Sequence, residues 1–468
     1  MNIIFTSDMN PTTGARRWKA VKRPGFGAAD PIATGTAIYT VTPPGSSVVG
    51  IIKTGTNTIR GFFGTTEDGS DTTVTGSSGS SRMKEFTDSS GTPTWAVTVA
   101  AATANRKSFL YTTGGGLVQI TDAEFPNGVV TGQPAFLDGY LFWMTFDLGR
   151  IYNSDLNAPT AYTSTGFLTT TSGDRGCGLA NYKDKILAIG SNYIEFYENV
   201  GNPTGSPLQQ IDQIRIVDYG AGTGSANGDL SHRYLSALDS FFWINNRSNN
   251  SGPGVYMLEG YRPKKISNQY IDMSLADDAN AFIAGTGSIF GLNYLFVSST
   301  SLMAYCFETG TWTTWETTTI FGVLNSHIVP SAGELANPFA LYLYVVDSRY
   351  QLDTGSLSVS TISYTDNDVA YSAIIQTRPI DFGTNNRKRL NRLTLIGADS
   401  RETSTCGISW SDDDGQNWST ARNVDMNDAR PTLTRLGAFR RRQFRFTNSS
   451  DAPQELEAME LDYDELAT

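Results

Sequence analysis

Cysteine, histidine and charged residues are scarce in this sequence. Its 468 residues include 3 cysteines and 2 histidines, and 17% of them are charged. The odd number and wide spacing of Cys177, Cys306 and Cys406 argue against a disulfide framework. His232 and His327 lack a set of further ligand residues at metal-binding spacing, which argues against a structural zinc site. We therefore expect no metal site and no other cofactor.

Long apolar runs and helical periodicity are missing as well. No apolar stretch is long enough to cross a bilayer, and the first eight residues lack the basic and apolar regions of a signal peptide. Apolar residues make up 39% of the chain and glycine contributes 46 residues, which is typical of short strands joined by tight turns. We expect an all-β protein that is made and folded in the cytoplasm and does not insert into a membrane.

Positive charge is in deficit. The chain has 35 Lys and Arg residues and 46 Asp and Glu residues, which gives a net charge of −11. A molecule with this charge repels nucleic acid as a whole, so sequence-specific DNA binding is not expected. The glycines at 114–116 do not lie between a strand and a helix, and we interpret them as a turn and not as a phosphate-binding loop.

A long series of short aromatic strands is present instead. From residue 95 to residue 377 they recur in groups of about four strands per 40–50 residues, the period of propeller blades, which predicts a β-propeller of about six blades. Residues 1–94 are expected to form an N-terminal arm with strands, one of which could close the propeller. This arm includes a Gly/Ser/Thr-rich insertion at about 64–93, which we interpret as an exposed loop. Longer, more charged strands predict a C-terminal β-sandwich over residues 378–468.

The segment 411–418 is typical of a hairpin tip. Ser411, Asp413, Gly415 and Trp418 have the spacing of an Asp-box, in which a carboxylate binds backbone N–H groups and glycine adopts a positive φ. Asn417 stands where the motif usually has Thr. The motif stabilises a turn and is not catalytic. Because it is commonest in sialidase-type propellers, an alternative function stays open: a receptor-binding or glycan-cleaving, sialidase-like propeller.

Glycan cleavage would need catalytic carboxylates. Glu195 with Glu198, or Asp366 with Asp368, could be such a pair. We interpret them as surface residues, because carboxylates are seldom buried. A sialidase also needs three arginines around a carboxylate, and the arginines of this chain concentrate after residue 378. We predict that the protein is not an enzyme.

A basic strand covers residues 439–446. With a period of two, Arg442, Phe444 and Phe446 share one face, which is largely core, whereas Arg441 and Arg445 share the other. The basic face is either solvated and partly paired with nearby glutamates, or it contacts an acidic neighbouring subunit. The candidate interface residues are Arg440, Arg441, Arg442, Arg445, Glu455 and Glu457.

Five phrases of the sequence follow one another in an order that resembles a known family. They are the turn Lys22-Arg23-Pro24-Gly25 and the segments 153–162, 194–201, 255–267 and 305–312. Together they resemble the packaged-DNA stabilisation proteins of short-tailed bacteriophages, also called tail hub or nozzle proteins. The resemblance runs over most of the chain.

This resemblance implies a structural protein of the virion tail. Its copies would form a homo-hexamer, a ring below the portal and its adaptor ring that a tail needle or plug closes and that carries tail spikes or fibres. The ring would retain the packaged DNA and conduct it at genome ejection without sequence-specific contacts.

Overall fold

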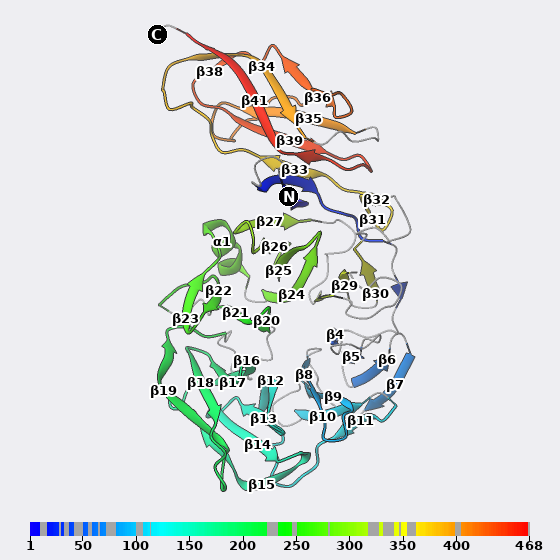
Figure 1. Cartoon of the computed structure of the whole chain (residues 1–468), viewed down its shortest axis with the longest axis vertical. Coiled ribbons are helices and arrows are strands. Elements are labelled where there is room, and N and C mark those ends of the chain that lie inside the picture. Colours follow the sequence, from blue (N-terminus) through cyan, green and yellow to red (C-terminus); the bar gives the residue numbers. More distant parts are fainter. Residues whose placement is uncertain are drawn as a thin grey trace.

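The computed structural model in Figure 1 is nearly all β. It describes residues 1–9, 16–27, 30–31, 37–41, 50–54, 59–63, 66–71, 81–99, 106–112, 114–221, 233–245, 250–278, 281–316, 327–330, 341–345, 348–352, 362–397 and 404–466. Within these ranges α1 (Gln269–Asp277) is the only helix, and it begins where the Asn268 side chain accepts a hydrogen bond from the Ile271 N–H at 3.1 Å. No helix in these ranges could cross a membrane.

Seven four-stranded antiparallel sheets form the larger unit of the described chain. They are β4 (Ala37–Val41), β5 (Gly50–Thr54), β6 (Ile59–Phe63) and β7 (Thr66–Asp71); β8 (Ser81–Thr87), β9 (Pro93–Val99), β10 (Lys107–Thr112) and β11 (Gly116–Gln119); β12 (Val130–Leu137), β13 (Tyr140–Thr145), β14 (Arg150–Asp155) and β15 (Ala158–Thr169); β16 (Gly176–Tyr182), β17 (Lys185–Gly190), β18 (Tyr193–Asn199) and β19 (Leu208–Val217); β20 (Tyr234–Ala237), β21 (Ser240–Ile244), β22 (Val255–Glu259) and β23 (Arg262–Lys265); β24 (Phe282–Ile289), β25 (Leu292–Ser298), β26 (Leu302–Cys306) and β27 (Thr311–Trp315); and β28 (His327–Pro330), β29 (Leu341–Val345), β30 (Ser348–Gln351) and β3 (Asp30–Pro31).

These sheets surround a common axis (Figure 1). The first strands of successive sheets contact one another in the order β4, β8, β12, β16, β20, β24 and β28, and β28 contacts β4 again. The described sheets are therefore the seven blades of a closed β-propeller. β3 from the N-terminal region is the outer strand of the last blade, where Asp30 is paired with Arg349.

Two expectations about this region were wrong. We expected the propeller to start near residue 95, but residues 37–71 form a complete blade that we had assigned to the N-terminal arm, so the described chain has seven blades where about six were expected. The segment 64–93, expected to be an exposed loop, contains β7 and β8, which pair with β6 and β9. β7 lies at the outer edge of its sheet, and an edge strand needs few apolar side chains, so its polar sequence resembled a loop. Residues 72–80 lie outside the described ranges.

Aromatic rings fill much of the space within and between blades. Trp243 of β21 is fully buried, and its ring stacks on Phe241 at a centroid distance of 5.5 Å and on Tyr256 at 5.6 Å. Each large ring removes much apolar surface from water, and offset stacking adds about 0.5–1.5 kcal/mol per pair. The scarcity of charge noted in the sequence follows from this packing, because blade strands are covered on both faces.

Side chains also fill the centre of the propeller. Arg82 of β8 donates from Nη2 to the carbonyl of Tyr234 in β20 at 3.1 Å, and its guanidinium lies 4.3 Å from the Tyr234 ring. The Tyr234 hydroxyl accepts the N–H of Gln133 in β12 at 2.9 Å. A Cβ at Gly178 would collide with that hydroxyl, so only glycine fits there. Because the blades of β8 and β20 are not neighbours, this contact crosses the axis and closes it at this level.

The C-terminal unit contains two antiparallel sheets. β33 (Ala373–Gln376), β39 (Gln443–Asn448), β35 (Thr405–Ser411) and β36 (Arg422–Asp425) form one, whereas β34 (Lys388–Ile396) pairs with β37 (Thr432–Thr434), β38 (Ala438–Phe439) and β41 (Ala458–Glu465) in the other. Leu393 of β34, Ile408 of β35 and Phe446 of β39 belong to the same hydrophobic core. The β-sandwich assignment for this unit stays a prediction.

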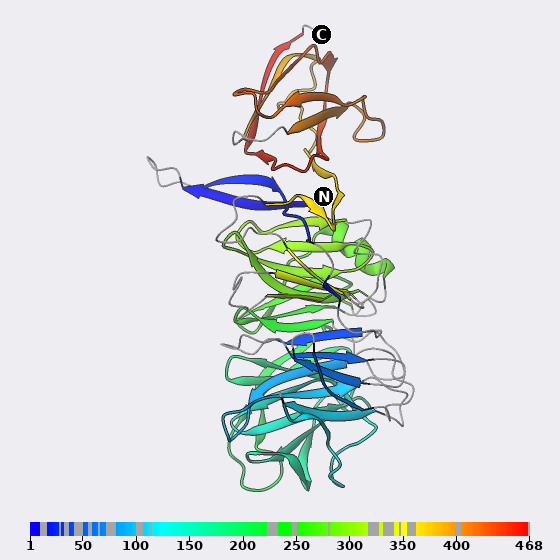
Figure 2. The ribbon, with the colours of Figure 1, turned by 90° about the vertical axis from the view of Figure 1, so that its right-hand side faces the viewer.

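A small third sheet lies between the two units (Figure 2). It consists of the hairpin β1 (Ile3–Met9) and β2 (Arg16–Lys22) with β40 (Glu455–Leu456), and nearby β31 (Thr365–Asp366) pairs with β32 (Val369–Ala370). The N-terminal hairpin and the short strand β40 of the C-terminal unit therefore share one sheet beside the propeller.

Candidate functional site

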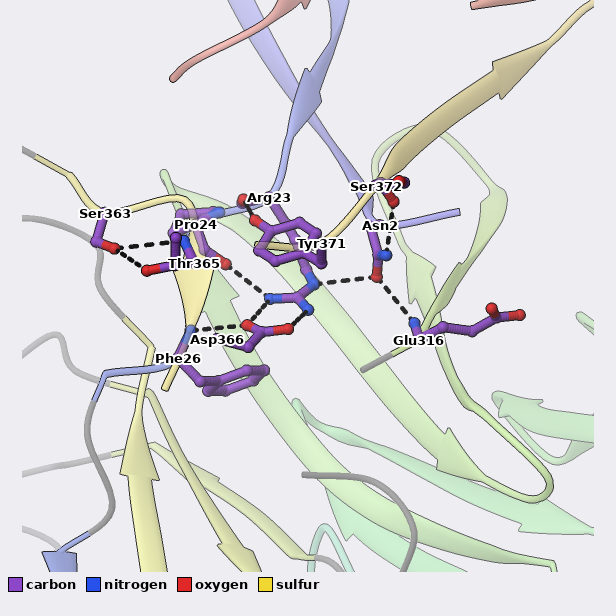
Figure 3. Close-up of polar contacts among 10 residues, drawn as sticks. All are labelled: Asn2, Arg23, Pro24, Phe26, Glu316, Ser363, Thr365, Asp366, Tyr371 and Ser372. Carbon is purple, nitrogen blue, oxygen red and sulfur yellow. Dashed lines mark hydrogen bonds and ion pairs between the residues drawn. The ribbon is translucent and has the colours of Figure 1, made fainter. Parts of the chain in front are cut away.

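The turn Lys22-Arg23-Pro24-Gly25 lies in the junction of the hairpin, the propeller and the C-terminal unit (Figure 3). The Arg23 guanidinium is buried and binds the Asp366 carboxylate through two bonds, Nη1 to Oδ1 at 2.9 Å and Nη2 to Oδ2 at 2.5 Å. Asp366 also accepts the backbone N–H of Phe26 at 3.0 Å. Asp366 is thus a buried residue, and its interpretation as a surface carboxylate was wrong.

Backbone groups and aromatic rings provide the remaining contacts of Arg23. Its Nη1 donates to the Pro24 carbonyl at 2.9 Å, and its backbone carbonyl accepts the Tyr371 hydroxyl. The guanidinium lies 4.1 Å from the centroid of the Tyr371 ring and 5.3 Å from that of Trp315, the last residue of β27. The ion pair is therefore enclosed by cation–π contacts that keep water out.

Asn2 connects the same ion pair to the propeller. Its Oδ1 accepts from Arg23 Nε at 3.3 Å and from the backbone N–H of Glu316 at 2.8 Å. Its Nδ2 donates to the Ser372 carbonyl at 2.9 Å (Figure 3). One amide side chain thus joins the hairpin, the end of blade β24–β27 and the segment that leads into β33.

Lys22 holds the C-terminal unit to the junction. Its buried Nζ donates to the Ser450 carbonyl at 2.6 Å and lies 4.5 Å from the centroid of the Tyr371 ring. Burial lowers the pKa of Lys22 to about 8, although the nearby Asp451 carboxylate opposes this effect. Burial destabilises the charged form of Lys22, and the side chain acts here as a structural hydrogen-bond donor.

Gly25 completes the turn because no other residue fits. Its N–H donates to the Ser363 carbonyl at 2.8 Å, and a Cβ on Gly25 would collide with the carbonyl oxygen of Thr365. The structure thus brings all four residues of the turn together as a joint between distant segments. Asp366, Asn2 and Tyr371 were missed as members of this site, since none of them lies in a recognisable motif.

Glu195 forms a second buried carboxylate site, in blade β16–β19. It accepts the N–H groups of Thr171 and Ser172 at 3.1 Å each and the Tyr197 hydroxyl at 2.7 Å, and Arg215 Nε lies 3.5 Å away. The expectation that Glu195 is a surface residue was wrong. Burial and the Glu195 carboxylate raise the pKa of Tyr197. The hydroxyl therefore stays protonated, and this Tyr/Glu pair fastens a loop instead of presenting a nucleophile.

The Asp-box residues form a dense turn at the end of β35. The Ser411 hydroxyl donates to Asp413 Oδ1 at 2.7 Å and accepts the Gly415 N–H at 2.9 Å. Asp413 Oδ1 also accepts the Asn417 N–H at 2.9 Å, and Trp418 Nε1 donates to the Gly415 carbonyl at 3.1 Å. These bonds, led by that of the Asn417 N–H, lower the pKa of Asp413 to about 2. Asn417 thus donates a hydrogen bond to Asp413 from the position where the motif usually has Thr.

The arginines of the basic strand contact this turn within the same chain. Arg442 is buried and binds Asp412 through two bonds of 2.6 and 2.8 Å, so it is not a surface group. Arg441 pairs with Asp414, and the Arg445 guanidinium lies 3.8 Å from the centroid of the Trp418 ring. The arginines Arg441, Arg442 and Arg445 thus contact the turn at 411–418 of their own chain.

The remaining candidate interface residues lie apart from the turn. Arg440 donates to the Asn385 carbonyl at 2.7 Å, and Glu455 pairs with Lys19 of the hairpin at 3.3 Å. Glu457 precedes β41, and its N–H donates to the Ile396 carbonyl at 2.8 Å. A contact of these residues with another subunit stays a prediction. Within the described ranges no group of three or more His, Cys, Asp or Glu residues could hold a metal ion.

Two solved structures illustrate a distant similarity. The extracellular domain of a putative one-component system from B. thetaiotaomicron is 11% identical with a TM-score of 0.43, over 92% of this chain and 58% of that one. The WD40 β-propeller domain of Doa1 is 10% identical with a TM-score of 0.41, over 70% of this chain and 96% of that one. The chain thus spans less than two thirds of the first of these. No curated protein matches it.

A family comparison is more specific. The family described as "Bacteriophage P22 Gp10, beta-propeller" matches residues 62–286, which run from the end of the first blade into the sixth. The matched residues include three of the five phrases that carried the sequence resemblance, namely 153–162, 194–201 and 255–267. Residues 62–286 are therefore similar to the bacteriophage P22 Gp10 β-propeller family, in agreement with the resemblance found in the sequence.

Proposed function

We propose that this protein is a structural component of a bacteriophage tail, a hub or nozzle that retains the packaged DNA and conducts it at ejection. The match of residues 62–286 to a phage propeller family carries this proposal, because that family is one of phage structural proteins. In the proposed assembly six copies form a ring below the portal and its adaptor, and a needle or plug and tail spikes or fibres attach to it.

The chemistry of the buried carboxylates supports a structural role. Asp366 is neutralised by Arg23 through two bonds, and Glu195 accepts two backbone N–H groups and a tyrosine hydroxyl. A general acid or nucleophile must face the substrate with a free oxygen. These carboxylates do not, which opposes the alternative of a glycan-cleaving propeller.

The path of DNA in this proposal lies between copies and not through a propeller. The Arg82–Tyr234 contact closes the propeller axis, so the conduit must be the space that several copies enclose. The net charge of −11 suits such a wall, because a basic wall would bind phosphate groups and hold the DNA. We expect Asp, Glu, Ser, Thr and Asn side chains to dominate the lumen.

Images of negatively stained virions and native mass spectrometry of the purified protein test this function. We expect a six-fold ring at the tail and a mass of six chains. A spike at the rim of the tail, or a protein that cleaves host glycans, would support the receptor-binding alternative instead. A lumen lined mainly by Lys and Arg would contradict the proposed conduit.

A further inference from the structure

One end of the propeller collects exposed apolar side chains. In a four-stranded antiparallel blade, the turns after the first and the third strand lie at the same end of the propeller, which we call the turn end. In the third to sixth blades five of these turns carry a large apolar side chain that is 41–55% exposed. They are Leu156, Val200, Leu238, Tyr261 and Phe290. A single exposed apolar residue needs no explanation, but several at one end of a fold mark an interaction surface.

Two of these residues adopt a backbone conformation that does not suit them. The first turns of the third, fifth and sixth blades have two residues each, Asp138-Gly139, Leu238-Asp239 and Phe290-Gly291. Their first residues have φ values of 50°, 51° and 49°, in the left-handed region. Aspartate suits this position, whereas the region disfavours bulky side chains such as those of Leu238 and Phe290. Residues that are unfavourable for the turn and also exposed point to a role outside the fold.

Charged side chains at the turn end pair with one another. Lys185 Nζ lies 3.2 Å from the Asp184 carboxylate and 3.7 Å from that of Glu198, and Lys264 pairs with Glu259 at 3.0 Å. Binding of nucleic acid requires a surplus of positive charge, which these pairs do not supply. The turn end therefore offers mainly apolar contact, and its occupant is an apolar protein surface.

The border between the fourth and fifth blades holds part of this surface in place. The Tyr182 hydroxyl of β16 donates to the Gly260 carbonyl at 2.8 Å. The neighbouring Tyr261 ring packs edge to face on Phe196 of β18, at a centroid distance of 5.2 Å. The outer turn of the fifth blade is thus fixed to the fourth blade. An anchor that is already positioned loses little conformational freedom on binding.

The opposite end of the propeller presents a second apolar surface. α1 connects β23 to β24 and therefore lies at the end opposite to the turn end, and Figure 2 shows the helix at one side of the propeller. Its residues Ile271 and Leu275 are buried in the core, whereas Tyr270 and Met273 are 66% and 61% exposed. Residues three positions apart lie on the same side of a helix, so α1 directs an apolar face outward.

We propose that the turn end of the propeller binds the outward face of α1 of a second copy. Both surfaces are apolar and occur once on each copy, and because they lie at opposite ends of the propeller they can meet only between copies. Such a contact is heterologous, one surface of each copy meeting a different surface of the next, which is the type of interface that builds rings. It rests on the proposed ring and specifies the contact between its subunits.

Substitutions in the full chain test this contact without harming the fold. Leu238→Asn with Phe290→Asn introduces a residue that tolerates the left-handed region, so thermal stability should be equal or higher. Self-association in sedimentation velocity should nevertheless weaken by roughly tenfold or more, because apolar anchors of the interface are lost. Tyr270→Gln with Met273→Gln should have the same effect. Val118→Asn with Val369→Asn replaces two valines that are exposed to a similar degree elsewhere, and it should leave self-association unchanged.

Cross-linking in solution identifies the occupant. The three native cysteines are buried, so a short bis-maleimide reagent should react with introduced cysteines in preference to them. Phe290→Cys protein mixed with Met273→Cys protein should give a cross-linked dimer. Neither protein should give this dimer alone, because each would then lack the complementary position.

The outcomes separate the contact from the ring. Self-association that either interface variant retains overturns the contact, while a six-fold ring in images of tails would leave the proposed function intact. If both variants lose association but the wild type forms open oligomers, the contact stands and the ring fails. A cross-linked dimer of Phe290→Cys protein alone shows that two turn ends meet, which overturns α1 as the occupant.

Two further results overturn the proposal. One is a wild type that stays monomeric at every concentration and gives no cross-link in the mixture. The other is a turn-end variant that self-associates normally but no longer adds to tails, because another tail protein is then the occupant.

Discussion

Breaking the Arg23–Asp366 ion pair should open the junction between the two units. Asp366→Asn keeps the size of the side chain but removes its charge and turns one acceptor into a donor that faces the guanidinium. Arg23 would then be a buried charge without a counter-ion, although it keeps its bonds to Pro24 and Asn2. Removing one partner of a buried pair costs about 3–5 kcal/mol.

Hydrogen exchange measured by mass spectrometry can locate this loss. A cost of about 3 kcal/mol corresponds to roughly 100-fold less protection of amide groups that open with the junction. We expect this change in segments 20–27 and 363–374, where the N–H groups of Gly25 and Asn367 are bonded across the junction. The core of blade β16–β19 should keep its protection.

Asp368→Asn is the matched control, because Asp368 is exposed and lies two residues away. It should change local stability by less than about 0.5 kcal/mol. Equal exchange in Asp366→Asn and the wild type at segment 20–27, or an equal loss in both variants, would refute the reasoning that the ion pair holds the junction.

Three further predictions concern other polar side chains. The pKa of Lys22 is about 8 in the folded protein, whereas the ordinary lysine value of 10.5 applies to the unfolded chain. Between these two pH values the unfolded chain binds more protons than the folded one, so Lys22 makes the free energy of unfolding increase with pH. In urea unfolding the gain from pH 8 to about pH 9.5 should be smaller in Lys22→Met than in the wild type. The lowered pKa of Asp413 stabilises the fold above the ordinary value of 3.8, and this contribution is lost as pH falls through about 2. Acid titration of Asp413→Ala should therefore show a smaller loss over that range, and an unchanged acid profile would contradict it. Glu195→Gln should cost about 2–3 kcal/mol in urea unfolding, since an acceptor of two N–H groups and a hydroxyl loses its charge. A matched Glu198→Gln, in a half-exposed position of the same strand with a long ion pair to Lys185, should cost little.

Local patterns could be predicted from the sequence. The period of two in the basic strand placed Arg442, Phe444 and Phe446 on the covered face, and all three are buried. The Asp-box spacing likewise located a turn whose bonds join residues at most four positions apart. Such features depend on neighbours in the chain, so their signal is contained in a short window.

Long-range features could not be predicted in this way. Arg23 and Asp366 are 343 positions apart, and nothing around Asp366 distinguishes a buried carboxylate from one in an exposed turn. The first blade was missed for a related reason, because its outer strand β7 is polar and lies beside a Gly/Ser/Thr-rich segment. The acidic partners of Arg441 and Arg442 could not be predicted either, because they depend on how the turn at 411–418 folds back on β39.

The closure of the propeller by β3 has a consequence for synthesis on the ribosome. The first thirty or so residues have their contacts with segments far along the chain: in the strand register Asp30 lies opposite Arg349 and Val21 opposite Glu455, and Arg23 forms an ion pair with Asp366. Folding during translation proceeds from the N-terminus, yet the first thirty or so residues must wait until nearly the whole chain has emerged. Blades made in between can form in sequence, but the ring and the junction close only at the end. A nascent chain that stops early therefore cannot complete its fold, which keeps truncated copies out of any assembly that recognises the closed form.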